Sequence, residues 1–175
     1  MDNKKVQLDL QKLFDALSDS NQKRRSEYHL TLGALIEKLK DANKSARINP
    51  EIVGICAYRG YYSDIALCTI NGTSAYKKPF NYEELYEDPK TRTCWSIEKW
   101  EKENEIKINV INKNPHELAE ILESLLDSYL DGYKGGSHMI TREKPLWLAS
   151  DYSNCSNNAI VGIDNNLKLE LKKIM

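Results

Sequence analysis

The sequence has few of the residues that staple small proteins together or hold metals. It contains four cysteines without a C-x-x-C pair, Cys56, Cys68, Cys94 and Cys155, and three widely separated histidines. This spacing disfavours zinc and is typical of reduced thiols, so we expect no metal site and no cofactor. Hydrophobic residues form 41% of the 175-residue chain, which suffices for a core without such staples.

The sequence also lacks an excess of either charge and any long apolar run. Its 25 Lys and Arg residues nearly balance 26 Asp and Glu residues, which argues against duplex nucleic acid or a membrane surface as a partner. No run approaches the ~20 apolar residues of a membrane span. The start, Met1–Lys5, leads into an amphipathic pattern and not into the apolar core of a signal peptide. We therefore expect a cytoplasmic protein.

Proline and glycine are scarce, with five and eight residues, and 29% of the chain is charged, which argues against disorder. The length predicts a single domain over residues 1–175. We interpret residues 1–29 as an N-terminal helix and a basic linker that contains Lys23–Arg25. The helix has one apolar stripe, available for the core or for contact with another copy. Its residues are Val6, Leu10, Leu13, Phe14 and Leu17.

Helical spacing and capping signals predict two further helices. Thr31 is the expected N-cap of the first, which turns Leu32, Leu35, Ile36 and Leu39 inward. The run Asn114–Glu117 starts the second, because it combines an Asn cap, a Pro at the first helical position and a Glu at the third. We expect that helix to continue to Gly132. Its expected buried face is Leu118, Ile121, Leu122, Leu125, Leu126 and Tyr129.

The other apolar segments are β-branched or alternating and predict strands. These segments are 52–57, 65–70, 107–111, 139–142, 146–150, 159–164 and 167–174, with a turn at 164–166. Residues 71–105 are irregular, aromatic and acidic, and we interpret them as a packed insertion with short helices. The fold class predicted is α+β, an antiparallel sheet with helices packed on one side.

The loop between the first two predicted strands has a composition suited to a nucleotide. It reads Tyr58-Arg59-Gly60-Tyr61-Tyr62-Ser63-Asp64. An arginine offers a planar fork of donors to phosphate oxygens, glycine permits close backbone approach, and tyrosines offer faces on which a base can stack. The alternative is a plain hairpin in which Arg59 pairs with Asp64 and the tyrosines fill the sheet edge.

A second candidate segment, Tyr133–His138, contains Lys134, Gly135 and Gly136. Two glycines can place consecutive amides in an anion-binding nest, and the lysine adds a mobile charge. The order of residues is not that of a Walker loop. The alternative is a helix C-cap followed by a turn, which by itself accounts for the glycines.

A third candidate is Arg142, which with Lys144 precedes the predicted strand that holds Trp147. These side chains can face the same ligand, although a tryptophan at such a position is more often part of the core. The sequence has no G-x-S-x-G elbow and no H-E-x-x-H helix. We therefore assign no catalytic residue and expect a protein that is not an enzyme.

Several of these segments together resemble a widespread family of small phage proteins, the first-described Thoeris anti-defence proteins, which act as sponges. The matching segments are Leu30–Glu37, Tyr58–Leu67, Gly132–Gly136, Met139 and Pro145–Ala149, and the resemblance covers residues 30–70 and 114–163. Such proteins bind and sequester cyclic ADP-ribose isomers made by bacterial TIR-domain immune enzymes. Some members are also understood to hold cyclic oligonucleotides at a separate site in a hexameric assembly.

The resemblance implies a small nucleotide-derived signalling molecule as the partner, bound without turnover in the cytoplasm of an infected bacterial host. It also implies a homo-oligomer, a hexamer or a dimer. The ligand-binding residues then expected are Arg59, Gly60, Tyr61, Tyr62, Lys134, Gly135, Gly136 and Arg142. Two alternatives are a nucleotide-processing enzyme and a protein-interaction module that uses residues 71–105 as its surface.

Overall fold

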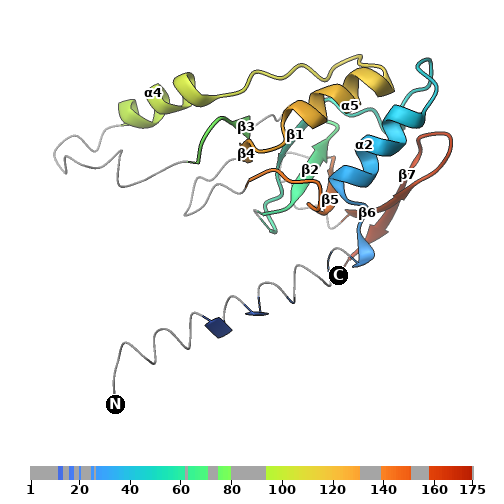
Figure 1. The fold of residues 1–175 in the computed structure, drawn as a ribbon, viewed down its shortest axis with the longest axis horizontal. Helices are drawn as coiled ribbons and strands as arrows, with labels where there is room; N and C mark the ends of the chain where they lie inside the picture. The colour runs from blue at the N-terminus through green and yellow to red at the C-terminus, as the bar shows by residue number, and fades with distance from the viewer. Residues whose placement is uncertain are drawn as a thin grey trace.

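The computed structural model describes most of the chain in several stretches. They are residues 27–61, 63–70, 75–79, 94–130, 139–150 and 158–174, together with Lys12, Leu13, Ala16, Leu17, Ser20 and Arg25. Within these residues the chain forms a five-stranded sheet, a two-stranded sheet and three helices (Figure 1). The predicted α+β class is therefore confirmed.

The five-stranded sheet has the order β1-β2-β5-β6-β7. Its strands are β1 (Gly54–Ala57), β2 (Ile65–Cys68), β5 (Leu146–Ala149), β6 (Asn158–Ile163) and β7 (Leu169–Lys173). Three of the four pairings are antiparallel, as predicted, but β2 and β5 run parallel with Ile65 opposite Leu146. Parallel neighbours need a long crossover. Here the residues between β2 and β5 form the two-stranded sheet and two of the three helices, and the chain then returns to the end of the sheet where β2 began.

Two helices cover one face of this sheet. Figure 1 shows α2 (Leu32–Asp41) and α5 (Pro115–Ser124) side by side across it. Both predicted N-caps are present: the Thr31 hydroxyl accepts a hydrogen bond from the Ala34 amide, and Asn114 and Glu117 form a reciprocal capping box. Local side-chain chemistry thus sets where both helices begin.

Alternation along the strands divides the buried side chains between the two faces. One set packs under α2 and α5 in the main core; from β2 and β5 it includes Ile65, Leu67, Leu146 and Leu148. The other set forms a smaller cluster on the opposite face, with Ala66, Cys68, Trp147, Ala149, Ala159 and Tyr58. The 58–64 loop therefore belongs to the face that the two helices leave uncovered.

The predicted extension of the second helix to Gly132 is wrong. Helix α5 ends at Ser124, and Asp127 adopts a positive φ of 66°. The Asp127 amide donates to the Ile140 carbonyl at 3.0 Å, and the Ile140 amide donates to the Ser128 carbonyl at 2.7 Å. These long-range bonds replace the helical ones, and β4 (Tyr129–Leu130) then pairs with β3 (Ala75–Tyr76). Gly132 itself lies outside the described residues.

Two short predicted strands are also wrong. Residues 107–111 contain no strand and contribute the buried Val110 to the core. In 139–142, Met139 makes only an isolated bridge with Tyr129. Alternation without a neighbouring ladder does not make a strand. Within the described part of 71–105, α4 (Cys94–Asn104) is helical, and its Trp100 packs on Tyr76 with ring centroids 5.1 Å apart.

The described residues of the N-terminal segment leave their apolar side chains in solvent. The backbone at Lys12, Leu13, Ala16 and Leu17 is helical, as predicted. Leu13 and Leu17 are 55% and 52% exposed, so at these positions the stripe is not packed against the domain. Across the described ranges, no helix has the length and apolar character that a membrane crossing requires.

Candidate functional site

A buried carboxylate anchors the 58–64 loop. The Asp64 side chain is fully buried (0% exposed), and its Oδ2 accepts a hydrogen bond from Trp147 Nε1 at 3.0 Å. The same oxygen forms an ion pair with Arg25 Nε at 3.2 Å. The Tyr58 amide also donates to the Asp64 carbonyl at 2.9 Å, and the Asp64 amide donates to the Tyr61 carbonyl at 2.8 Å. The loop is therefore closed by its own backbone and fixed to β5.

Aromatic rings are layered around Trp147. Tyr58 stacks on it in parallel planes with centroids 4.2 Å apart, and His29 contacts it at 4.7 Å with a tilt of 54°. Tyr61 lies farther out at 6.1 Å and remains 47% exposed. The Arg25 guanidinium sits 4.3 Å from the centroid of the Tyr61 ring, which is cation–π distance. Tyr61 is thus the exposed ring of an otherwise buried aromatic cluster.

Two ionisable side chains near Asp64, His29 and Lys144, have pKa values that burial lowers. His29 Nδ1 donates to the Arg25 carbonyl at 2.6 Å, and burial lowers the pKa of His29. Burial also lowers the pKa of Lys144, which is 7% exposed, while the nearby charge of Asp64 acts in the opposite direction. Asp64 and Arg25 form the ion pair at the centre of this cluster, and burial disfavours the charged forms of His29 and Lys144 beside it.

Arg59 is exposed at the tip of the loop. Among the residues that the structure describes, it has no ion-pair partner, because the carboxylate of Asp64 is paired with Arg25. The alternative interpretation of the loop, in which Arg59 pairs with Asp64, is therefore wrong. The second part of that interpretation, in which the tyrosines fill the sheet edge, is correct for Tyr58, which is buried against the sheet, but not for the exposed Tyr61.

Gly60 has a steric role next to the buried ring. A Cβ atom at this position would lie 2.5 Å from Tyr58 Cε1. The Tyr58 ring is held by its stack on Trp147 and cannot move aside freely. Only glycine fits here without displacing the stack.

Arg142 is placed among the helices and not at the loop. Its guanidinium forms ion pairs with Glu37 of α2 and, at 3.5 Å, with Glu123 of α5. Hydrogen bonding from Lys40, with a further contribution from the charge of Arg142, lowers the pKa of Glu123. Arg142 thus connects the two helices on the covered face of the sheet. The remaining predicted site residues, Tyr62, Lys134, Gly135 and Gly136, lie outside the described residues.

The structure brings Arg59, Gly60 and Tyr61 together in one anchored loop, and it adds two residues that the sequence did not assign to the site. Arg25 reaches the loop from the N-terminal segment, and His29 packs under it. The only sequence signal for Arg25 was the small basic cluster at residues 23–25. Its pairing with Asp64 joins positions far apart in the chain, which no local pattern reveals.

Comparison with protein-family models, curated proteins and solved structures finds no significant match to this chain. In the described part of the chain, no three His, Cys, Asp or Glu side chains are grouped so that they would hold a metal ion. The candidate site is thus the 58–64 loop, which exposes the Arg59 guanidinium and the Tyr61 ring and is fixed through Asp64 to Trp147 and Arg25. Such a loop is suited to holding an anionic, base-containing molecule.

Proposed function

We propose that this protein binds and sequesters a nucleotide-derived signalling molecule, a cyclic ADP-ribose isomer, and releases it unchanged. The observation that carries the proposal is the anchored loop, which presents Arg59 and Tyr61 to solvent while Asp64 and Tyr58 are buried. The ligand class rests on the resemblance of this loop and of Pro145–Ala149 to the Thoeris anti-defence sponges. Cyclic oligonucleotides are a second class of ligand to be tested.

The loop is preorganised for binding. Its backbone is closed by two internal hydrogen bonds, and its base is fixed to Trp147 and Arg25. A binding residue on such a loop loses little conformational freedom when the ligand arrives, and less free energy is lost to ordering. Arg59 supplies a two-pronged donor for a phosphate, and Tyr61 supplies a face for a purine.

The charges of the loop favour binding over acid–base catalysis. Asp64 is the one carboxylate of the segment 58–64. Its Oδ1 accepts from the Ser63 hydroxyl at 3.2 Å, and its Oδ2 is occupied by Trp147 and Arg25. A carboxylate with both oxygens engaged is poorly placed to take a proton from a substrate. We accordingly propose that the protein is not an enzyme.

We further propose a homo-oligomer, a hexamer or a dimer, acting in the cytoplasm of the infected host. One exposed loop contacts a ligand from a single side, whereas symmetric copies can enclose it. The exposed Leu13 and Leu17 offer apolar surface for such a contact.

Calorimetry with cyclic ADP-ribose isomers and cyclic oligonucleotides tests the proposal. Replacing Arg59 by alanine should weaken binding by about 1.5 to 3 kcal/mol, the range for a hydrogen bond to a charged group, which is roughly ten- to hundredfold. The exposed Lys38 on α2 is the control, since Lys38→Ala removes one positive charge elsewhere.

Three outcomes would count against the proposal. Unchanged affinity in folded Arg59→Ala protein would remove this residue from the site. An absence of binding for every nucleotide tested would overturn the function itself. Ligand recovered in altered form after heat denaturation of the complex would identify an enzyme.

A further inference from the structure

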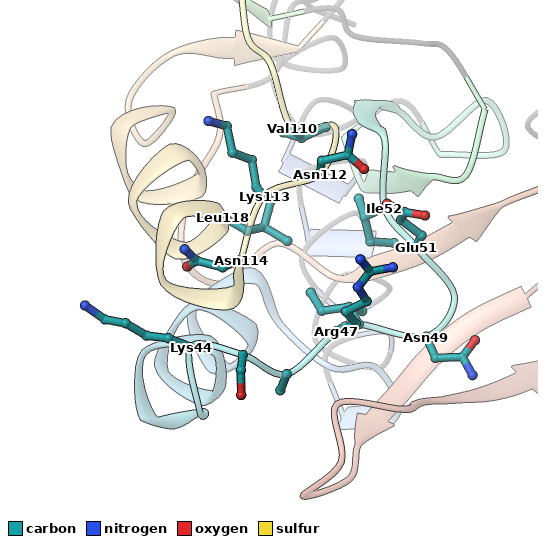
Figure 2. Close-up of a pocket in the computed structure, with 13 residues that line it drawn as sticks. Lys44, Arg47, Asn49, Glu51, Ile52, Val110, Asn112, Lys113, Asn114 and Leu118 are labelled. Atoms are coloured by element: carbon teal, nitrogen blue, oxygen red, sulfur yellow. The ribbon is translucent and has the colours of Figure 1, made fainter.

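A separate cavity lies beside the main core. It has a volume of about 580 Å³ and is formed by the loop after α2, the residues that lead into β1, and the segment before α5 (Figure 2). Its volume lies within the range of small-molecule pockets. None of its lining residues belongs to the 58–64 loop.

Positive charge dominates the lining of this cavity. Lys44, Arg47 and Lys113 stand against one carboxylate, Glu51, which leaves a net charge of +2. Figure 2 shows the Arg47 guanidinium between the side of the cavity with Asn114 and Leu118 and the side with Ile52, while the Lys44 and Lys113 side chains extend outward, away from Arg47. Lys44 and Arg47 form no ion pair with a described residue, and Lys113 has only an exposed contact of 3.8 Å with Glu117. Such exposed contacts are weak, so the charge of the cavity is not neutralised by the protein around it.

The floor of the cavity is apolar. Ile52, Val110 and Leu118 are all buried members of the main core, and all three line it. A site with cations at its rim and aliphatic side chains at its base matches a ligand that has an anionic group and an apolar body.

The walls are held in place by hydrogen bonds. His116 Nε2 donates to the Ala42 carbonyl at 2.8 Å, which joins α5 to the end of α2. The side chain of Asn43 accepts from the Ser45 amide at 2.9 Å. The Asn49 amide donates to the Leu167 carbonyl at 3.2 Å, which joins the segment that leads into β1 to the residues just before β7. The cavity therefore exists before any ligand arrives.

The N-terminus of α5 also faces this region, but it does not account for the charge. Its capping box already uses the Glu117 amide, and Pro115 has no amide hydrogen to donate. The attraction for an anion must therefore come chiefly from the side-chain cations.

We propose that this cavity binds a small organic phosphate, with the phosphate at Arg47 and the apolar part against Ile52 and Leu118. A phosphate monoester dianion has the charge that neutralises the net +2 of the lining, and the planar guanidinium of Arg47 can donate two hydrogen bonds to it. Glu51 opposes the anion and limits its affinity. The site is independent of the function proposed for the 58–64 loop.

Phenyl phosphate is the probe for the full-length protein, with inorganic phosphate as the comparison. Calorimetry at low ionic strength should show that phenyl phosphate binds more tightly, because only phenyl phosphate covers the apolar floor. Arg47→Gln should weaken its binding about tenfold or more, and Lys113→Met should weaken it less. Glu51→Gln should strengthen binding, since it removes the opposing charge.

Two controls separate this site from the loop. Lys38→Met removes a lysine charge on the exposed surface of α2 and should not change phenyl phosphate binding. Arg59→Ala removes the candidate phosphate-binding cation of the loop and should leave in place the binding that depends on Arg47. Shifts of the Ser45 and Asn112 amide resonances should mark the cavity as the place of binding. Full affinity in Arg47→Gln, weaker binding in Glu51→Gln, or no binding at millimolar probe would overturn the proposal. Loss of binding in Arg59→Ala would move the phosphate to the loop.

Discussion

Replacing Asp64 by alanine removes the group that holds the candidate loop to the sheet. The variant loses the hydrogen bond from Trp147 Nε1 at 3.0 Å and the ion pair with Arg25 Nε at 3.2 Å. The two changes are unequal, because Trp147 is buried, whereas the Arg25 side chain keeps 19% of its surface in solvent. The Arg25 guanidinium can therefore be hydrated after the substitution, whereas the buried indole N–H of Trp147 cannot.

The loss of stability follows from this hydrogen bond and this ion pair. Removing one partner of a buried ion pair costs about 3 to 5 kcal/mol, and the partial exposure of Arg25 places this pair at the lower end. A buried donor without an acceptor costs about 1 to 3 kcal/mol. Since the two costs overlap at one carboxylate oxygen, we expect about 3 to 4 kcal/mol for Asp64→Ala. Asp64→Asn also loses the ion pair but keeps an acceptor for Trp147, so we expect it to cost about 1 kcal/mol or more less than the alanine variant.

Urea denaturation followed by far-UV circular dichroism measures both variants, with Glu98→Gln as a control on the exposed surface of α4. The midpoint should fall in the order control, Asp64→Asn, Asp64→Ala, while the denaturant slope stays constant. The reasoning is refuted if Asp64→Ala costs less than about 1 kcal/mol, or if Asp64→Asn is as destabilising as the alanine variant. The second result would mean that the hydrogen bond to Trp147 contributes nothing without the charge.

Two further predictions concern neighbours of Asp64. Gly60→Ala should destabilise the protein by about 1 to 3 kcal/mol, because its Cβ would lie 2.5 Å from the stacked Tyr58 ring; a change below 0.5 kcal/mol in urea denaturation would show that the stack yields easily. Burial lowers the pKa of His29 below 6.5, so the unfolded state binds its proton first as the pH falls, and stability drops below about pH 6.5. His29→Gln should reduce the difference in urea midpoint between pH 7 and pH 5, and an equal difference in both proteins would contradict this.

The parts of the fold that sequence reasoning predicted correctly are those set by neighbouring residues. Thr31 caps α2 through an amide three residues ahead, and Asn114 and Glu117 complete a box across the same distance. The turn at Asp164 is of the same kind, since its side chain accepts from the Asn166 and Lys168 amides at 2.8 and 2.9 Å. In each case the two hydrogen-bonded residues lie at most four positions apart in the sequence, so a local pattern can predict them.

The errors arise where a distant partner decides the outcome. The apolar spacing through Leu125 and Tyr129 fits a continuing helix, but the hydrogen bonds to Ile140 and the pairing of β4 with β3 replace it. The parallel pairing of β2 with β5 likewise depends on the route of the chain between them. At the candidate site, composition predicted roles for Arg59 and Tyr61, and both are exposed, but the pairing of Asp64 with Arg25 could not be predicted because the two residues are far apart in the sequence.

Although the net charge of the chain is only −1, its arginines differ in whether they form ion pairs within the protein. Arg25 and Arg142 are each paired with carboxylates, one on each face of the sheet, and their positive charges are thereby committed to the fold. Among the described residues, Arg59 and Arg47 have no such partner, and each lies at a place where a ligand has access, a loop tip or a cavity wall. An anion is expected to bind where positive charge has no internal partner. The same criterion therefore supports a binding role for Arg59 and Arg47 and assigns Arg142 to holding α2 and α5 together.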